Sequence, residues 1–474
     1  MKLFLIGIGH TRPEQIDVAR KLQKNHQISY WVRMNHVFSI DEKEFPDTIF
    51  HSYKDALAGK AAPGVDTSHF DPPSAELITA LSSYESELLT MMNKWYPEWN
   101  VSKRKNFYYD LLTYWSGVLD TYEPDAIVFL EIPHEIYSFV LFALSKHRGI
   151  RTLMFENTIT YDRLSAYEDY RIGDTKILDG HRHGFKRIEG LEALSPDVRE
   201  EFERTAKKDE PPQFTDAFYA GYRGLKYRYA QVRAVIRFVR DGSIWERLFN
   251  RVGNLFKESL TSEHRRCEQP ADLSKSYVYL GLHSQPERTT SPQGGVYVDQ
   301  ILLAQTIAAA LPDGWLLYIK EHPAQWALSQ RKYTAYRYRG YYEEIARIPR
   351  TRLVPITTNT FALMRSAKAV ATVTGTVGWE AVVRSIPALI FGYAWYRYCD
   401  GVLRITSTND VREAFKKIQS GYSVDPQKVL DFVGCLDKAT FWSSLNPYVA
   451  TVDAEEQAMG IDNMYQAIVK HLES

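Results

Sequence analysis

The sequence predicts an α/β fold with two Rossmann-like domains, on three observations. The chain has 474 residues, which is too many for one ordinary hydrophobic core and suits two domains of similar size. Short apolar runs rich in β-branched or aromatic residues recur in both halves, and such runs are typical of buried parallel strands. The polar stretch 263–274 contains Pro270 and has no periodic pattern, so we expect it to link the two domains.

The first predicted domain, residues 1–265, opens with a Rossmann-like unit. Residues 3–6 predict a strand, a glycine-containing loop follows, and residues 13–23 and 28–32 predict a helix and a second strand. The Gly-x-Gly of the loop is weak evidence for a dinucleotide site, because the third glycine and an acid after the second strand are missing. His10 lies in this loop and is a candidate catalytic residue; the alternative is a surface role.

The rest of this domain continues after an irregular insertion. Residues 34–71 have no sustained period and several turn formers, so we expect no regular structure there. Ser74 is placed to cap the N-terminus of a helix over 74–96. The next expected elements are a helix over 106–122 and strands over 125–130 and 152–155.

Two acids come directly after predicted strands of the first domain. Glu131 follows the strand 125–130, and Glu156 follows the strand 152–155. Ligands of open α/β sheets bind at the carboxyl ends of the strands, so both acids are candidate catalytic residues. The alternative for each acid is a helix cap or a salt bridge.

A basic segment with interleaved large apolar residues spans 222–240. Its six basic residues, uninterrupted by an acid, are Arg223, Lys226, Arg228, Arg233, Arg237 and Arg240. A basic amphipathic helix can dock on an anionic membrane through apolar burial and charge attraction. The segment therefore predicts a peripheral membrane contact, with an ordinary surface helix as the alternative.

The amino-acid composition limits the classes of binding partner and the cellular compartment that we expect for this protein. Acids and bases cancel to a net charge of zero, which gives no general attraction to nucleic acid. The three cysteines are far apart and lack metal-ligand spacing, which favours a reducing cytoplasm. The N-terminal apolar run is too short for a signal peptide, and no run is long enough to span a bilayer. We expect a soluble or peripherally bound protein.

The second predicted domain, residues 275–445, alternates strands and helices. We expect strands over 277–281, 315–319, 352–354, 369–373 and 388–392. We expect helices over 298–310, 360–366, 411–419 and 426–433, and a final helix over 455–472 within the segment 446–474. Strands that alternate with helices predict a parallel sheet.

Two short motifs follow strands of this domain. The first is Lys320-Glu321-His322-Pro323, and the second is Thr374-Gly375-Thr376-Val377-Gly378-Trp379-Glu380-Ala381. The second motif is a small-residue turn that enters a helix, where unpaired N–H groups and the helix dipole favour an anion such as phosphate. Lys320 and His322 add a positive charge and a side-chain donor. A plain glycine turn and a structural histidine are the alternatives.

These motifs, together with Gln285-Pro286-Glu287-Arg288-Thr289-Thr290, resemble the capsule polysaccharide biosynthesis family. That family includes the Kdo transferases of capsule assembly, whose members look like GT-B glycosyltransferases. The resemblance implies a GT-B-like arrangement, in which two Rossmann-like domains face a central cleft and the C-terminal helix packs back towards the first domain. In the first half of the chain, the resemblance is limited to Phe155-Glu156-Asn157. Asn157-Thr158 stands there in place of an expected glycine, so the identities of the catalytic residue and of the acceptor stay open.

The resemblance implies a glycosyltransferase that takes its sugar, a CMP-linked ulosonic acid such as Kdo, from a nucleotide donor. No Asp-x-Asp motif appears at a strand end, which favours a metal-independent mechanism. It implies no cofactor beyond that donor, and a glycan or glycolipid acceptor. The donor-binding residues implied are Gln285, Glu287, Lys320, His322, Pro323, Thr374, Gly375, Thr376, Gly378 and Glu380. Two other functions remain open: a CDP-polyol phosphotransferase, and a non-catalytic assembly subunit that binds nucleotide-sugar or polymer.

Overall fold

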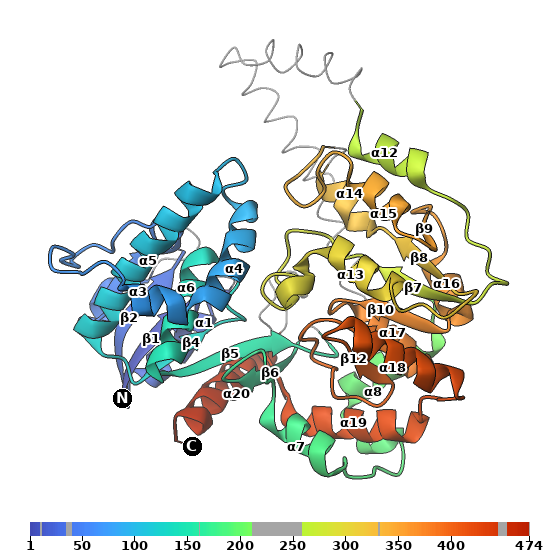
Figure 1. Cartoon of the computed structure of the whole chain (residues 1–474). Coiled ribbons are helices and arrows are strands. Elements are labelled where there is room, and N and C mark those ends of the chain that lie inside the picture. Colours follow the sequence, from blue (N-terminus) through green and yellow to red (C-terminus); the bar gives the residue numbers. More distant parts are fainter. Residues whose placement is uncertain are drawn as a thin grey trace, which may run out of the picture.

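The computed structural model describes residues 1–9, 12–34, 40–160, 162–210, 258–329, 332–443 and 453–473. His10 and the basic segment 222–240 lie outside these residues, so the expectations for both stay predictions. The described chain forms two α/β domains, each built around its own sheet (Figure 1). The predicted class, two Rossmann-like domains in a GT-B-like fold, is confirmed.

The first sheet has the strand order β13-β6-β5-β4-β1-β2-β3. Its strands are β1 (Lys2–Ile6), β2 (Gln27–Arg33), β3 (Ile49–Ser52), β4 (Ala126–Phe129), β5 (Arg151–Asn157), β6 (Arg163–Tyr167) and β13 (Phe441–Trp442). The five strands from β5 to β3 pair in parallel, whereas β6 is antiparallel to both β5 and β13. The antiparallel β5–β6 pair extends the sheet towards the second domain (Figure 1).

Helices cover both faces of this sheet. They are α1 (Gln15–Leu22), α2 (Tyr53–Leu57), α3 (Ala75–Ala80), α4 (Ser82–Met91), α5 (Val101–Tyr122), α6 (Ile136–Arg148) and α20 (Ala454–Glu473). One face packs its apolar side chains against α5 and α6, and the other packs against α1 and α20. Ser74 caps α3 as expected, because its side chain accepts the main-chain N–H of Leu77.

The second sheet is entirely parallel, with the strand order β12-β11-β10-β7-β8-β9. Its strands are β7 (Tyr277–Gly281), β8 (Leu316–Lys320), β9 (Thr351–Val354), β10 (Ala369–Thr372), β11 (Ala388–Ile390) and β12 (Val402–Arg404). The helices after residue 258 are α12 (Leu260–Cys267), α13 (Gln300–Ala308), α14 (Pro323–Ser329), α15 (Tyr341–Arg347), α16 (Thr360–Ser366), α17 (Thr376–Val383), α18 (Thr408–Gln419) and α19 (Pro426–Ala439).

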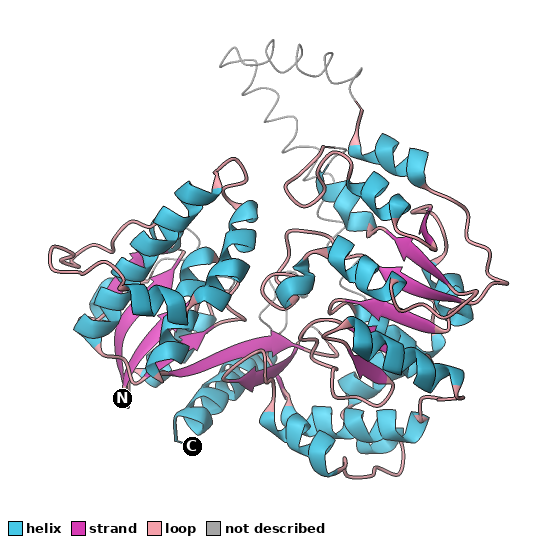
Figure 2. Cartoon of the chain, in the orientation of Figure 1, coloured by secondary structure: helices cyan, strands magenta, loops and turns pink. Residues whose placement is uncertain are grey.

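The chain passes between the domains more than once. Helices α7 (Thr175–His183) and α8 (Pro196–Lys207) lie within the first predicted segment, 1–265, yet pack on α19 and α17 of the second domain. In the other direction, β13 joins the first sheet and α20 packs on α1. Figure 2 shows the β5–β6 pair between the two groups of helices. The domains are therefore joined by exchanged elements rather than by one linker.

The expectations for two segments were wrong. The insertion 34–71 contains the edge strand β3, whose four residues are too few to show a period. The expected linker 263–274 begins inside α12, which starts with a capping box at Ser259. Glu263 looked like a linker acid, but it is fully buried and accepts the main-chain N–H groups of Gly340 and Tyr342 at 3.0 and 2.9 Å.

The carboxyl ends of the two sheets face each other across the domain boundary. Arg288, in the loop after β7, donates to Glu131, which follows β4, at 3.3 Å. Gln293, from the same loop, donates to Glu156 of β5 at 2.6 Å. Loops that follow parallel strands in one domain therefore contact strand ends in the other, which is where ligands bind in open α/β sheets.

Candidate functional site

Three motif segments lie side by side at one edge of the second sheet. The order β10-β7-β8 makes the loops after these strands neighbours: the glycine–threonine turn after β10, residues 282–293 after β7, and the segment from Glu321 after β8. Gly281 lies opposite Lys320, and Leu280 lies opposite Ala371, so the three strands end at nearly the same level. The second sheet thus brings together residues that lie far apart in the sequence.

His283 supports the glycine–threonine turn from behind. Its Nε2 lies 2.9 Å from Oγ1 of Thr372 and accepts the main-chain N–H of Thr374 at 3.2 Å. The Thr372 hydroxyl in turn accepts the N–H of Gly375 at 3.3 Å. Burial, with the charges of His322 and Arg337, lowers the pKa of His283 to about 3. The imidazole therefore stays neutral at working pH and serves as an acceptor.

This support changes which donors the turn can offer to a ligand. The N–H groups of Thr374 and Gly375, which the motif suggested for phosphate, are already bonded, and the Thr374 hydroxyl donates to Thr289 at 2.7 Å. Thr376 and Val377 open α17, and the first N–H groups of a helix have no intrahelical acceptor. The donors that α17 directs outward are therefore those of Thr376 and Val377.

Both glycines of this motif stand where a side chain would not fit. A Cβ atom at Gly375 would lie 2.8 Å from Oγ1 of Thr372. A Cβ atom at Gly378 would lie 2.4 Å from the hydroxyl oxygen of Tyr396, which itself donates to the carbonyl of Gly375. The glycines therefore allow close packing at the start of α17. Gly378 is buried there and does not present a surface to a nucleotide-sugar.

Lys320 and His322 occupy different surroundings at the end of β8. Lys320 is buried, donates to the Thr360 hydroxyl at 2.6 Å, and burial lowers its pKa to about 8. His322 is exposed, and its Nδ1 accepts the N–H of Ala324 at 3.1 Å. A neutral His322 therefore carries its proton on Nε2, which makes that atom a donor. Pro323 follows as the exposed first residue of α14.

Glu380 lies one turn into α17 and is largely buried. Burial raises the pKa of its carboxyl group, and the positive charge of Arg384 opposes this shift. The hydroxyl of Thr376, which is exposed at the start of the helix, hydrogen-bonds to the same carboxyl group. Glu380 is thus positioned to orient Thr376.

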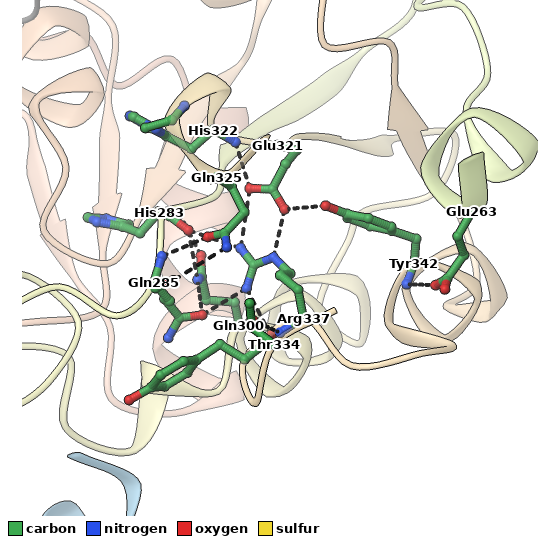
Figure 3. A network of polar contacts seen from close by, with 12 residues as sticks. Glu263, His283, Gln285, Gln300, Glu321, His322, Gln325, Thr334, Arg337 and Tyr342 are labelled. Atoms are coloured by element: carbon green, nitrogen blue, oxygen red, sulfur yellow. Dashed lines mark hydrogen bonds and ion pairs between the residues drawn. The ribbon is translucent and has the colours of Figure 1, made fainter. Parts of the chain in front are cut away.

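Behind the His322 segment lies a buried polar network that the motifs did not reveal (Figure 3). Glu321 and Arg337 form an ion pair of 2.7 Å in which both side chains are completely buried. Burial alone would raise the pKa of Glu321, but Arg337 and the Tyr342 hydroxyl lower it overall. Because Glu321 also accepts the N–H of His322 at 2.7 Å, the network fixes the backbone of that segment.

Gln285 belongs to this network. Its carbonyl oxygen accepts from Arg337 at 2.8 Å and from Gln300 at 2.7 Å, and its amide donates to Val298 at 2.9 Å. The side chain is 4% exposed, so its contacts hold the loop after β7. Glu287, further along that loop, is exposed and accepts from Ser284 and Thr289.

The two candidate acids of the first domain have different settings. Glu156 is 5% exposed, and its two oxygens accept from Tyr167 and Gln293, both at 2.6 Å. Glu131 has a side chain that is 45% exposed and pairs with Arg288. Both lie at the domain boundary, and Glu156 lines a small cavity there.

The sequence predicts no metal site, and this stays a prediction. Within the described ranges there is no group of three or more His, Cys, Asp or Glu side chains that could hold a metal ion. The positive charges near the strand ends come from side chains, chiefly Lys320 and Arg288.

Comparison with known proteins gives a family for part of the chain. Residues 289–417 match the family described as "Capsule polysaccharide biosynthesis protein", which confirms the resemblance over that segment. No curated protein sequence matches the chain.

Solved structures that are similar to this chain include a transferase and two epimerases, all at low sequence identity. A β-Kdo 2,7 transferase, KpsC of Thermosulfurimonas dismutans, is 10% identical, covers 79% of this chain and 95% of its own, and has a TM-score of 0.31. The UDP-GlcNAc 2-epimerase of Methanocaldococcus jannaschii is 11% identical, with coverages of 90% and 95% and a TM-score of 0.25. The corresponding epimerase of Neisseria meningitidis, bound to UDP-GlcNAc, is 11% identical, with full coverage of both chains and a TM-score of 0.25.

Proposed function

We propose that this protein is a glycosyltransferase of capsule or surface polysaccharide synthesis. It takes its sugar from a nucleotide donor, for which a CMP-linked ulosonic acid such as Kdo is our first candidate, and passes it to a glycan or glycolipid. The observation that carries the proposal is the strand order β10-β7-β8, which gathers the three motif segments at one edge, facing the acids of the first domain.

The proposed donor site stabilises the departing phosphate. Transfer leaves negative charge on the nucleotide, and prearranged donors aimed at that charge lower the barrier. Here the donors are Nε2 of His322 and the N–H groups that open α17, and Lys320 contributes positive charge from the neighbouring strand end. Glu321 and His283 hold these hydrogen-bonding groups in place, but they do not face the nucleotide-sugar.

The acceptor hydroxyl needs a base, and the first domain supplies candidates. Glu156 lines the interdomain cavity next to the loop 289–293, and Glu131 is more exposed. We propose Glu156 as the base, because its position at the junction puts it beside residues of both domains. His10 remains a candidate from the sequence alone.

Nucleotide binding tests the donor site. We expect titration calorimetry to show tighter binding of CMP than of UDP, and weaker binding as pH rises from 7 to 9. The reason is that the Lys320 ammonium, with a pKa of about 8, is mostly charged below that pH and mostly neutral above it.

The Lys320→Met variant is the matched control for this titration. It should bind CMP more weakly at pH 7 and should lose the pH dependence. If CMP affinity falls with rising pH in the variant as it does in the wild type, Lys320 does not belong to the donor site. Tighter binding of CDP than of CMP, or of UDP than of CMP, would favour another donor class, including the CDP-polyol alternative.

We also propose that the reaction needs no divalent metal. The charges assigned to the leaving phosphate come from protein groups, and the sequence has no Asp-x-Asp motif at a strand end. Transfer should therefore proceed at an unchanged rate in excess EDTA. Complete loss in EDTA that magnesium or manganese restores would contradict this proposal.

The place of action proposed here is the cytoplasm, at the inner face of the membrane where a lipid-linked acceptor would lie. No helix in the described part of the chain is long and apolar enough to cross a bilayer. Attachment through residues 222–240 is a proposal from the sequence pattern alone.

A further inference from the structure

A small cavity lies at the junction of the two domains. Strands β5 and β6 contribute Glu156, Ser165 and Tyr167 to its wall, and the loop after β11 contributes Trp395 and Arg397. Asp174, which caps α7, completes the polar lining. The cavity is therefore built from residues of both domains, in contact with the candidate base Glu156.

Arg397 is the unusual residue of this cavity. Its side chain is 4% exposed, and its Nη1 donates to the carbonyl of Ala394 at 3.3 Å. Nε and Nη2 have no hydrogen-bond partner among the described residues. A buried donor left without an acceptor is costly, more so on a charged group, and native proteins rarely keep one without a reason.

The guanidinium is nevertheless held firmly in position. It stacks on the rings of Tyr393 and Tyr398, with its central carbon 5.7 and 5.0 Å from their centroids. Gly173 leaves the space for it, since a Cβ atom there would lie 2.5 Å from Nη2. Two buried donors without an acceptor are thus fixed on one edge of a planar, permanently charged group.

The acids of the cavity do not use these donors. Glu156 accepts from Tyr167 and Gln293, and Asp174 accepts from the Ser165 hydroxyl and from the main-chain N–H groups that begin α7. Neither acid is within ion-pair distance of Arg397. Their attraction explains how a buried cation is tolerated there, but it leaves Nε and Nη2 without a hydrogen-bond acceptor.

We propose that Arg397 binds a two-oxygen anionic group of a substrate in this cavity. The edge formed by Nε and Nη2 matches the spacing of a carboxylate or of two phosphate oxygens, and two parallel charge-assisted hydrogen bonds fix the group in orientation as well as position. The choice of a substrate anion rests on the proposed function. A sugar-acid carboxylate and a nucleotide phosphate are the two sources that this chemistry allows.

The test measures binding to the full chain by calorimetry with four probes: free Kdo, CMP, inorganic phosphate and glucose. The variant is Arg397→Met. The matched control is Arg404→Met, since Arg404 is exposed at the end of β12 and stacks on the same Tyr398 ring. Melting temperatures without ligand are recorded for all three proteins, because removing a buried cation with open donors should not lower the melting temperature.

We expect Arg397→Met to bind at least one anionic probe tenfold or more weakly than the wild type and to melt at no lower temperature. We expect Arg404→Met to bind the probes as the wild type does. Loss of Kdo binding alone identifies a carboxylate, and loss of CMP and phosphate binding identifies a phosphate. The proposal is overturned if the wild type binds no anion, or if Arg397→Met binds every anion as the wild type does. It is also overturned if glucose binding is lost equally, or if the variant melts at a lower temperature with its binding retained. Because the readout is binding, absence of transfer with every donor would refute the proposed function without affecting this result.

Discussion

Replacing Arg337 with methionine should destabilise the second domain by about 3–5 kcal/mol, because the change leaves the carboxylate of Glu321 buried without its counter-charge. Both partners of this pair are completely buried, and Arg337 also donates to Gln285 and to the carbonyl of His283. The measurement is the midpoint of urea unfolding at pH 7. We expect the variant to unfold at a markedly lower concentration.

Two controls separate the buried charge from a general effect of losing an arginine. The double variant Glu321→Gln/Arg337→Met removes both charges and should recover much of the loss. Arg347→Met breaks an exposed pair with Glu343 and should cost at most about 1 kcal/mol. If Arg347→Met and Arg337→Met shift the midpoint equally, the buried pair has no special role.

The pair should also make stability depend on pH in a defined direction. The folded pKa of Glu321 lies below its unfolded value, so its contribution is present above the unfolded pKa of about 4.3 and is lost as pH falls through the folded value. Without Arg337, burial would instead raise the folded pKa of Glu321. The stability difference between the wild type and Arg337→Met should therefore shrink as pH falls from that raised pKa through the lowered pKa of the wild type.

Replacing Glu156 with glutamine should lower kcat by about 10²–10⁴-fold, which is the range for loss of a general base. Glutamine keeps the shape of the side chain and can still bond to Tyr167 or Gln293, so the fold and donor binding should change little. The measurement is steady-state transfer by purified protein, together with its melting temperature.

Gln293→Ala is the matched control for Glu156. It removes the contact between the domains at Oε1 but keeps the carboxylate. A large loss in Glu156→Gln with a small loss in Gln293→Ala supports the role of a base. Equal losses in both variants would show that Glu156 acts only by joining the domains.

The sequence predicted the strands of both sheets best where apolar runs were long and bounded. It located the strand ends that carry Lys320, Glu156 and the glycine–threonine turn, because period and turn chemistry are local properties. It missed β3, β6, β12 and β13, which have four, five, three and two residues and too little length for a pattern. Of these, β3, β12 and β13 lie at sheet edges.

The sequence predicted which segments form the candidate site, but it did not predict the role of each residue in it. Nothing local marks Arg337 among the tyrosines and arginines around it, since its partner Glu321 lies 16 residues away and the pair forms only in the folded core. Gln285 looked like a donor ligand because it lies in a strand-end motif, yet its side chain points into that core. Arg397 shows no pattern at all in the sequence, and only folding brings it into the lining of the same cavity as Glu156.

Product analysis by mass spectrometry tests the central claim most directly. Purified protein is incubated with CMP-Kdo and a glycolipid acceptor, with UDP-sugars and a CDP-polyol in parallel, and His322→Ala serves as the control. We predict that the acceptor gains the mass of one ulosonic acid residue for each CMP released, and that His322→Ala loses tenfold or more of this activity. Addition of a polyol phosphate, or no acceptor growth with any donor, would contradict the account.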